Sequence, residues 1–276
     1  MSSFSSPFWN PDSGVDYDHF TFSIRRLDTA GLRHEPNFPE VDLPIYGFVL
    51  LTEGEILLHV KENQILVRPG ELLMMPPHAH FRIDYYNNSV GYSGGFHVSI
   101  LKDASYEILY TGAPLQQRFD KDDAAFINGM LARMYKAYTA DPVRISYIRS
   151  ALDFLINNIR PGEKERSRSL SSRYLERVFD RSLPAGSVAS VSAELGVAAD
   201  RLTREVRKET GRTALEWIEI SRINYAKQLL VESDKSVVEI ADTVGIDDHS
   251  YFSRFFRLKT GFTPTAYRRA KRKSAK

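Results

Sequence analysis

The sequence predicts an α+β protein of two domains: an N-terminal β-barrel with dimerisation helices, and a C-terminal all-α domain with two helix-turn-helix motifs. Three observations support this prediction. Short strand-forming segments occupy the first part of the chain, the hydrophobic period then changes from two residues to about 3.6, and one helical unit recurs in a basic C-terminal part. A chain of 276 residues with 42% hydrophobic residues is long enough to build two separate cores.

The N-terminal segments are predicted to be strands because they are short, apolar and separated by turn-forming residues. The clearest turns are Glu-Gly-Glu at residues 53–55 and Pro69-Gly70. The expected strands are residues 44–52, 56–61, 64–68, 72–75, 81–86 and 96–101. So many closely spaced strands favour a small barrel or a sandwich. The first twenty residues, rich in Ser, Pro and aromatic residues, favour an arm.

The segment Gly91-Tyr-Ser-Gly-Gly95 matches the nucleophile-elbow pattern, in which a serine occupies a strained turn between a strand and a helix. Here a strand-forming run, Phe96 to Leu101, follows the segment instead of a helix. We therefore expect a glycine-rich hairpin or bulge rather than a hydrolase site.

Residues 119–160 are predicted to form a helical dimerisation segment, because their apolar residues repeat at helical spacing. The first stripe contains Ile127, Met130, Leu131, Met134 and Tyr138, and the second contains Ile145, Ile148, Leu152, Leu155, Ile156 and Ile159. Asp141-Pro142 separates the two helices. Each stripe can pack on the barrel, on its neighbour, or on the same helix of a second subunit, and we favour a subunit contact.

The distribution of charge separates the two domains. The formal net charge is only +2, but residues 164–276 contain 23 Lys and Arg against 15 Asp and Glu, a balance of +8, and residues 1–163 have a balance of −6. A basic domain suits contact with a polyanion. The predicted linker between the two domains is residues 161–169, a polar and charged stretch that begins with Pro-Gly.

The basic part contains an internal repeat with an offset of 49 to 50 residues. Residues 187–197 match residues 236–246, and residues 202–211 match residues 252–261. Each copy reads as a short helix, a turn and a second helix, which is the helix-turn-helix pattern. In this pattern the second helix enters the major groove of DNA.

The residues at the turns fit this interpretation. Gly196 and Gly245 stand where a positive φ is needed, and the second helix is expected to begin at Asp200 in the first copy and at Asp247 or Asp248 in the second. A connecting helix over residues 214–230 is about 25 Å long at 1.5 Å per residue. With a helix-turn-helix unit at each end, this helix would let the protein reach two major-groove segments about 34 Å apart. If the distance between the two units is shorter than this, the DNA would have to bend.

Two groups of basic residues have less specific interpretations. Arg222 is in phase with the apolar side of the connecting helix, and an ion pair with a neighbouring acid is its expected role. The run from Arg268 to Lys273 is expected to be a solvated end that adds salt-dependent affinity near DNA.

Residues 187–268 resemble the DNA-binding domain of AraC/XylS-type transcriptional regulators. The residues that carry the resemblance in the second copy are Ile240, Ala241, Val244, Gly245, Ile246, Ser250 to Phe256, Lys259, Gly261, Pro264 and Tyr267. In the first copy, Val206 replaces the usual aromatic residue, and Ala198-Ala199 replace the usual polar residues. The resemblance implies a DNA-binding regulator that acts on promoter DNA as a homodimer and contacts RNA polymerase.

The outward residues of the two second helices are the predicted DNA contacts. Those expected to face base edges are Asp200, Thr203, Arg204, His249, Ser250 and Arg254. Those expected to contact phosphates are Arg207, Arg257 and Lys259. A bidentate pair between an arginine and a guanine discriminates by about 1–3 kcal/mol. The alternative for Arg204 and Arg254 is an internal ion pair that stabilises the bundle.

The N-terminal half looks like the cupin-type effector domain of the same family, through residues 46–54 and 68–77. This resemblance implies that residues 1–118 form a cupin-like effector-binding barrel and that a small molecule, where there is one, binds inside it. The expected lining of such a pocket is Tyr46, His80, Tyr92, Phe96 and His97. Residues 170–276 are then the DNA-binding domain.

Several classes of site are excluded or not favoured. The chain has no cysteine, which excludes disulfides and thiolate metal sites. No signal peptide or bilayer-spanning apolar run is recognisable, so we expect a cytoplasmic protein without membrane contact. His78 and His80 lie on one side of an extended segment, and Asp84 and His97 would complete a metal set, but we predict no metal, no cofactor and no catalytic residue.

The predicted function is a sequence-specific DNA-binding transcription regulator, an activator, that responds to a small-molecule effector in the barrel. Two alternatives remain open. One is an effector-independent regulator whose barrel is packed solid, and the other is a metal-dependent cupin enzyme with a DNA-binding tail.

Overall fold

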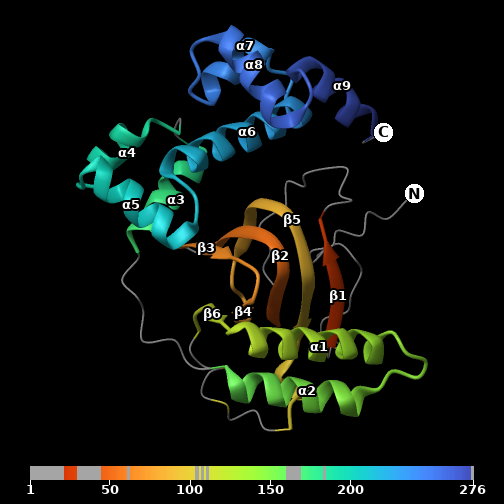
Figure 1. Cartoon of the computed structure of the whole chain (residues 1–276). Helices are drawn as coiled ribbons and strands as arrows, with labels where there is room; N and C mark the ends of the chain where they lie inside the picture. The colour runs from red at the N-terminus through yellow and green to blue at the C-terminus, as the bar shows by residue number, and fades with distance from the viewer. Residues whose placement is uncertain are drawn as a thin grey trace. The chain divides into compact units, whose positions relative to one another are not determined.

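A computed structural model describes residues 22–29, 45–60, 63–102, 106, 109, 112–159, 169–182 and 185–274. They form two compact units, one built mainly from residues 22–159 and the other mainly from residues 169–274 (Figure 1). The predicted N-terminal arm and residues 161–168 of the predicted linker lie outside the described residues. None of the helices among the described residues combines the length and the hydropathy of a membrane span.

The first unit is built on an antiparallel sheet with two helices, and the second is all-helical, so the two-domain α+β class is confirmed. The strands run in the order β1-β5-β2-β4-β6, and β3 pairs with β2. Their bounds are β1 Phe22–Asp28, β2 Tyr46–Val60, β3 Asn63–Val67, β4 Glu71–Met75, β5 Phe81–Phe96 and β6 Leu115–Arg118.

Several strand boundaries differ from the predicted ones. The expected turn at residues 53–55 is part of the continuous strand β2, whose pairing with β5 shifts register between Leu51 and Glu55. In the expected strand at residues 96–101, only Phe96 belongs to a strand, as the last residue of β5. Val98–Ile100 form a short 3-10 helix, η1, which His97 caps by accepting a hydrogen bond from the Ser99 N–H. The sequence pattern also did not predict β1 or β6.

The glycine-rich segment lies inside β5, between β1 and β2, so the predicted hairpin or bulge is wrong. A Cβ atom at Gly91 would lie 2.0 Å from the carbonyl oxygen of Leu50, and one at Gly94 would lie 2.3 Å from that of Ser23. Glycine is required because the neighbouring backbones approach so closely. Since strand continues on both sides of Ser93, the strand-turn-helix context of a nucleophile elbow is absent from this segment.

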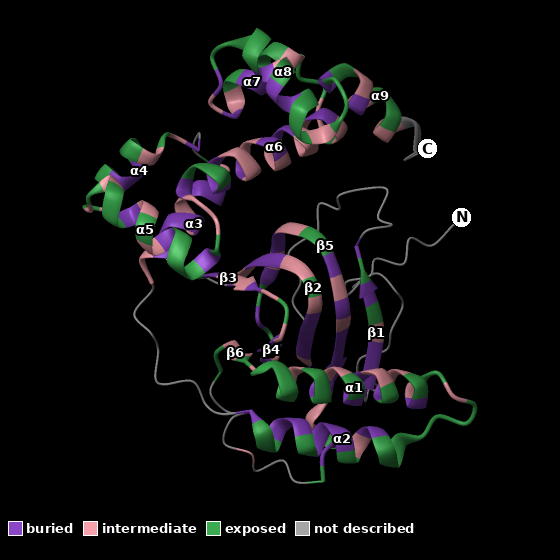
Figure 2. Cartoon of the chain, viewed as in Figure 1, coloured by how far each residue is buried: buried purple, intermediate pink, exposed green. Residues whose placement is uncertain are grey.

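Side-chain alternation along the strands divides the apolar residues between two faces of the sheet. On β4, Leu72 and Met74 lie on one face, and Leu73 and Met75 lie on the other. We call the first set, which packs against the helices, the helix-side cluster. We call the second set the inner cluster, whose members are Leu27, Ile45, Val49, Leu51, Ile56, Leu58, Val60, Val67, Leu73, Met75, Ala79, Phe81 and Ile83. Both clusters are buried, and much of the sheet is coloured as buried in Figure 2.

Helices α1 (Lys121–Tyr138) and α2 (Ile145–Asn158) pack on the helix-side cluster and on each other (Figure 1). The Asp120 side chain caps α1 by accepting hydrogen bonds from the N–H groups of Asp122 and Asp123. Most residues of the two predicted stripes are buried, Tyr138 is partly buried and Ile145 is exposed. Packing within this unit therefore accounts for most of both stripes.

The second unit is helical along its described length, as predicted. Its helices are α3 Leu170–Phe179, α4 Val188–Glu194, α5 Ala199–Thr210, α6 Ala214–Glu232, α7 Val237–Thr243, α8 His249–Thr260 and α9 Pro264–Ser274. The two sequence copies are α4–α5 and α7–α8, and α6 connects them, close to the predicted bounds (Figure 1). The duplicated helix-turn-helix arrangement is confirmed.

Candidate nucleic-acid interface

The second helix-turn-helix unit has local signals at each of its boundaries. Ser236 and Glu239 form a capping box at the start of α7, and Gly245 has a φ of 75° in the turn. The Asp248 carboxylate caps α8 by accepting a hydrogen bond from the Tyr251 N–H at 2.8 Å. Phe252 and Phe256 are fully buried beneath α8, so the helix presents its other side to solvent.

The first unit has the same frame with weaker signals. Ser187 and Ser190 form the capping box of α4, and Gly196 has a φ of 69°. The N-cap of α5 is Ala198, which provides no side-chain hydrogen bond, so the prediction that Asp200 opens this helix is wrong. Asp200 lies in the first turn instead, where a carboxylate favours the positive end of the helix dipole.

The predicted base contacts lie on the solvent side of the two second helices. Asp200, Arg204, His249, Ser250 and Arg254 are exposed, and Thr203 is partly exposed.

Arg204 and Arg254 occupy equivalent positions in the two copies. Neither guanidinium makes a hydrogen bond or an ion pair with another residue in the described part of the chain. The internal ion pair that we considered for these two arginines is therefore not formed among the described residues. His249 differs, because its Nε2 lies 2.8 Å from Oδ1 of Asp242 on α7.

The predicted phosphate contacts fall into two kinds. Arg207 and Arg257 are exposed. Lys259 is also exposed, but its Nζ lies 2.6 Å from Oε2 of Glu219 on α6 and 5.7 Å from the centre of the Phe255 ring. Lys259 thus joins α8 to α6, and a phosphate would have to compete with Glu219 for its charge.

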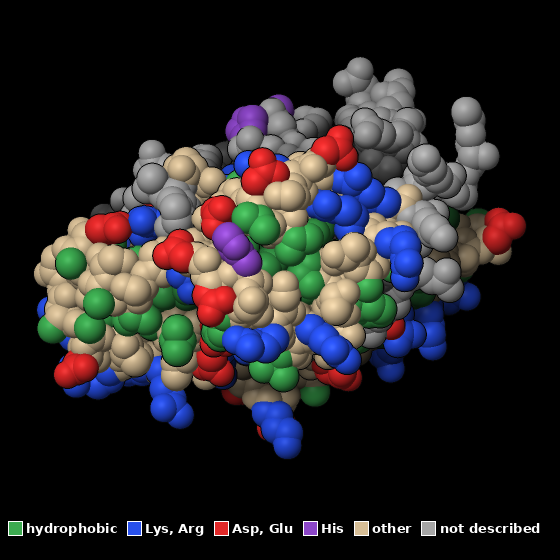
Figure 3. Space-filling model, turned by 90° about the horizontal axis from the view of Figure 1, so that it is seen from above, with side chains coloured by type: hydrophobic (Ala, Val, Ile, Leu, Met, Phe, Trp, Pro, Cys, Tyr) green, Lys and Arg blue, Asp and Glu red, His purple; other side chains and the backbone are tan. Residues whose placement is uncertain are grey.

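Basic side chains do not form one block on the face of the molecule that Figure 3 shows. On the face turned to the viewer in Figure 3, Lys and Arg side chains stand among acidic and hydrophobic ones. The candidate contacts therefore follow from helix position and exposure rather than from one basic block.

The connecting helix α6 is firmly anchored at its start. Thr213 and Glu216 form a capping box, and the pKa of Glu216 is lowered because its carboxylate accepts hydrogen bonds from the backbone N–H and the hydroxyl of Thr213. The Tyr174 hydroxyl of α3 donates to the carbonyl oxygen of Ala214 at 2.7 Å, and burial raises the pKa of this tyrosine. Trp217, fully buried, donates from Nε1 to the Thr210 hydroxyl of α5.

Arg222 lies further along α6 and is not held by an acid as predicted. Its Nη2 donates to the carbonyl oxygen of Gly186 at 2.8 Å, in the turn before α4. Burial lowers the pKa of the guanidinium.

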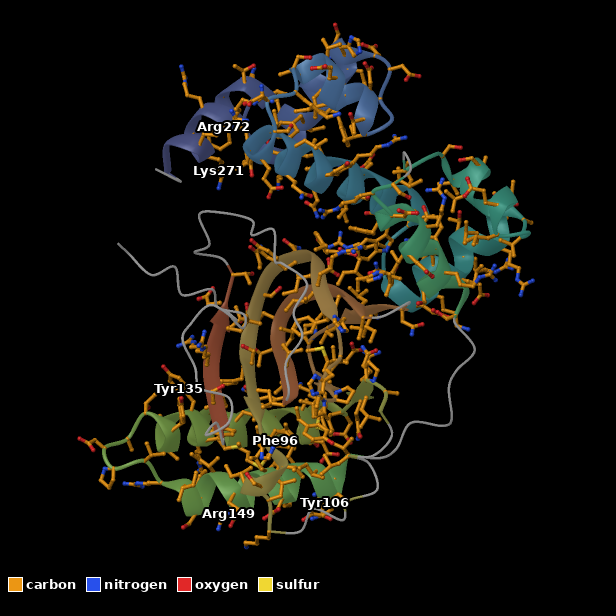
Figure 4. The ribbon with its side chains drawn as sticks, turned by 180° about the vertical axis from the view of Figure 1, so that it is seen from behind. Phe96, Tyr106, Tyr135, Arg149, Lys271 and Arg272 are labelled. Atoms are coloured by element: carbon orange, nitrogen blue, oxygen red, sulfur yellow. The ribbon has the colours of Figure 1, made fainter. Side chains whose placement is uncertain are left out.

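In the N-terminal unit, the five residues predicted to line a pocket lie elsewhere. Tyr46, Tyr92 and Phe96 are on the helix side of the sheet, where Phe96 and Tyr135 are labelled in Figure 4. Tyr46 stacks on Phe96 with ring centres 5.2 Å apart and donates to the carbonyl oxygen of Leu109. His80 is exposed, and His97 caps η1.

A hollow does occur on the opposite face, within the inner cluster. It has an empty volume of about 560 Å³, open solvent at its mouth included. Its lining is apolar except for Ser93, and includes Ile45, Val49, Ile56, Leu58, Met75, Ala79, Phe81 and Ile83. None of the five predicted residues lines it, because strand alternation turns Tyr46, Tyr92 and Phe96 to the other side.

The residues of the considered metal set are not brought together. Asp84 is buried and accepts a hydrogen bond from Nε of Arg82 at 2.7 Å. His78 and His80 are exposed. Within the described ranges, no three His, Asp or Glu side chains form a group that could hold a metal ion.

Comparison with known proteins gives the chain its family. A family profile described as a helix-turn-helix domain matches residues 191–270. The HTH-type transcriptional regulator ExsA of Pseudomonas aeruginosa is 33% identical over 259 residues, which cover 82% of this chain and 86% of that protein. The chain belongs to the AraC family of transcriptional regulators.

Two further similarities are of different extent. The arabinose operon regulatory protein of Salmonella typhimurium is 25% identical over 249 residues, which cover 84% of this chain and 86% of that protein. The C-terminal domain of AraT, a response regulator from Geobacillus stearothermophilus, is a solved structure with 28% identity and a TM-score of 0.35, covering 38% of this chain and 88% of that one.

The AraC-family assignment makes the chain a DNA-binding transcriptional regulator, as its sequence motifs implied. The matched range spans most of both helix-turn-helix units. ExsA and the arabinose operon protein are themselves named as regulators of transcription or of an operon.

The basic run at the end of this AraC-family chain has a structural role that the sequence interpretation missed. Arg268 of α9 donates to the carbonyl oxygens of Leu230 and Lys235, and Arg272 (Figure 4) donates to those of Val231 and Ser233. These groups satisfy carbonyls at the end of α6, which has no basic residue in its own last turn. The spacing of four residues between the two arginines was the available signal.

We predict that Arg272→Ala destabilises the C-terminal unit by about 1–2 kcal/mol, because it removes charged hydrogen bonds to the end of α6. Arg269→Ala is the matched control, since Arg269 is exposed and has no hydrogen bond or ion pair among the described residues. Urea unfolding followed by far-UV circular dichroism measures both. Equal stability of the two variants would contradict the capping role.

Proposed function

We propose that this AraC-family regulator reads a specific promoter sequence through both helix-turn-helix units of one chain. The observation that carries the proposal is the pair Arg204 and Arg254, exposed at equivalent positions on α5 and α8 and unpaired among the described residues. The two units are joined by α6, whose 19 residues extend about 28 Å. That length suits two successive major-groove segments, about 34 Å apart, once the bundles at each end are added.

The proposed contacts keep the roles expected from the sequence. Base contacts come from Asp200, Thr203, Arg204, His249, Ser250 and Arg254, and phosphate contacts come from Arg207, Arg257 and Lys259. The pairs His249–Asp242 and Lys259–Glu219 favour Arg204, Arg254 and Arg257 as the stronger contributors, because their charges have no competing acid among the described residues. Phosphate contacts set affinity, and base contacts set sequence preference.

For the N-terminal part we propose a cupin-like effector barrel over residues 1–118, a dimerisation segment over 119–160, a linker over 161–169 and a DNA-binding domain over 170–276. The hollow in the inner cluster supports an effector, and its lining favours a small, uncharged, apolar molecule, because a charged group would lose its hydration there without a partner. Effector binding would then select between placements of the DNA-binding domains. Activation through RNA polymerase and a cytoplasmic location complete the proposal.

A homodimer is supported by the outer side of α1 and α2. Phe126 and Phe154 are 58% and 43% exposed and pack on each other with ring centres 5.5 Å apart. Ile145 and Tyr147 are exposed on α2 as well. Paired exposed aromatic side chains are typical of subunit contacts.

The base-reading role predicts that Arg254→Ala weakens binding to the preferred duplex by about 10- to 100-fold and relaxes the preference at one base pair. Arg257→Ala is expected to weaken binding to all sequences and to lower the dependence of affinity on salt. Arg173→Ala, an exposed arginine of α3, serves as the control. Selection of duplexes from a random pool, followed by fluorescence anisotropy, measures these effects. Unchanged affinity and unchanged preference of Arg254→Ala would remove α8 as a reading helix.

The dimer proposal predicts that Phe126→Glu or Phe154→Glu shifts the protein from dimer to monomer, because a charge would have to be buried in the contact. Sedimentation velocity of the full chain is the measurement, with Leu258→Glu, at an exposed apolar residue of α8, as a control for the added negative charge. A wild-type monomer, or a dimer that persists in both variants, would contradict this interface.

The apolar effector proposal predicts that aliphatic alcohols raise the thermal stability of the chain more than carboxylates of equal length. Ala79→Leu, which fills the hollow, is expected to abolish the shift, whereas Ala193→Leu on the exposed side of α4 retains it. A ligand at 100 times its dissociation constant adds about 2.7 kcal/mol. If no uncharged compound gives a shift, the effector-independent regulator is favoured instead, and if Ala79→Leu keeps the shift, the compound binds outside this hollow.

A further inference from the structure

Arg222 occupies the middle of α6, between the two helix-turn-helix units, and it is half-buried. Its hydrogen bond from Nη2 to the carbonyl oxygen of Gly186 reaches the first unit. Its Nε is buried and has no hydrogen-bond partner in the described part of the chain. One side of the guanidinium is therefore held by the first unit, while another has lost water without a replacement.

The acceptor is itself held in place. Gly186 has a φ of 61°, which favours glycine, and a Cβ atom there would lie 2.7 Å from the hydroxyl of Ser190. Ser190 belongs to the capping box that starts α4. The hydrogen bond from Arg222 thus fastens α6 to the turn that sets the direction of α4.

The second unit attracts the same guanidinium. Burial lowers the pKa of Arg222, and Tyr251, Glu219, Asp247 and Tyr174 act in the opposite direction. Tyr251 lies on α8, and Asp247 lies in the turn before it. Arg222 is therefore hydrogen-bonded to the first unit, and the charged group of the second unit that acts on it at neutral pH is the Asp247 carboxylate, because a tyrosine hydroxyl is uncharged there. Lys259, by contrast, pairs with Glu219 and joins α8 to α6 alone.

A half-buried charge of this kind adds little to stability, because the loss of hydration offsets much of the attraction. Its better-supported use is to select one geometry among several. In the C-terminal unit, the geometry that Arg222 can select is the angle between the two helix-turn-helix units along α6.

We propose that Arg222 is a positioning residue that fixes this angle and thereby the spacing between the two DNA segments that one chain reads. The proposal rests on the proposed function, in which both units bind one duplex. One base pair added between the segments rotates one against the other by about 34–36°. A chain with a fixed angle should therefore discriminate between spacings, and a chain with a loosened angle should not.

The test uses the full chain and the duplex that wild type selects from a random pool. That duplex is compared with versions that have one base pair inserted or deleted between the two contacted segments. The variants are Arg222→Met, which keeps most of the side-chain length without the charge, and Arg173→Met, an exposed arginine that controls for lost charge. Dissociation constants are measured at one salt concentration. The readout is the dissociation constant for the altered spacing divided by that for the selected spacing, because a general loss of affinity cancels in this ratio.

We expect wild type and Arg173→Met to lose about tenfold in affinity when the spacing changes by one base pair, and Arg222→Met to lose about threefold or less. Equal discrimination by folded Arg222→Met and wild type would overturn the role of Arg222 while leaving two-segment binding intact. A wild-type chain that ignores spacing would instead overturn the proposed function and this inference together.

A second variant covers the case in which Arg222→Met does not fold, as judged by circular dichroism. Asp247→Asn removes the attraction from the second unit and leaves the bond to Gly186 in place. A reduced ratio between spacings in Asp247→Asn supports the proposal. An unchanged ratio overturns it.

Discussion

The DNA-binding unit depends on α6 being one uninterrupted helix that is stabilised at both ends. Its first turn is closed by the Thr213 and Glu216 capping box, and its last carbonyls accept hydrogen bonds from Arg268 and Arg272 of α9. Without these partners the terminal groups of the helix would lack hydrogen bonds from protein. Because each helix-turn-helix unit packs on a different part of α6, a frayed end would loosen the placement of α5 or α8.

The two helix-turn-helix units have the same order of helices and turns, but they differ in helix capping and in the side chains that fill their cores. In the second, Asp248 caps α8, and Phe252 and Phe256 fill the core beneath it. In the first, α5 starts without a side-chain cap, although Val206 is fully buried where the family usually has an aromatic residue. The first core is thus closed with a smaller side chain. The second unit is the more strongly capped of the two, which agrees with the stronger family resemblance of its sequence.

Sequence patterns predicted the C-terminal unit well because its signals are local. Capping residues, turn glycines and helical periodicity each act within a few residues, and the repeat supplied every signal twice. The bounds of α6 followed closely from this pattern. The partners of Arg222, Arg268 and Arg272 did not, because each is a backbone carbonyl distant in sequence.

The N-terminal unit was harder to predict because strand faces depend on register. Register shifts within β2 change which residues point inward. Odd-numbered residues, Val49 and Leu51, belong to the inner cluster before the shifts, and even-numbered residues, Ile56 and Leu58, belong to it after them. Three residues of the pocket assigned by residue type, Tyr46, Tyr92 and Phe96, consequently lie on the helix side. The expected turn at residues 53–55 failed for a related reason, since a paired strand can pass through glycine when its partner accommodates the shift.

Hydroxyl-radical footprinting of one chain's binding site tests the central claim most directly. Two arginine-bearing helices fixed on α6 predict two protected segments on the same side of the duplex, about one helical turn or 34 Å apart. Removal of the Arg204 side chain should weaken one segment, and removal of the Arg254 side chain should weaken the other. A single protected segment per chain, or two on opposite sides of the duplex, would contradict the account.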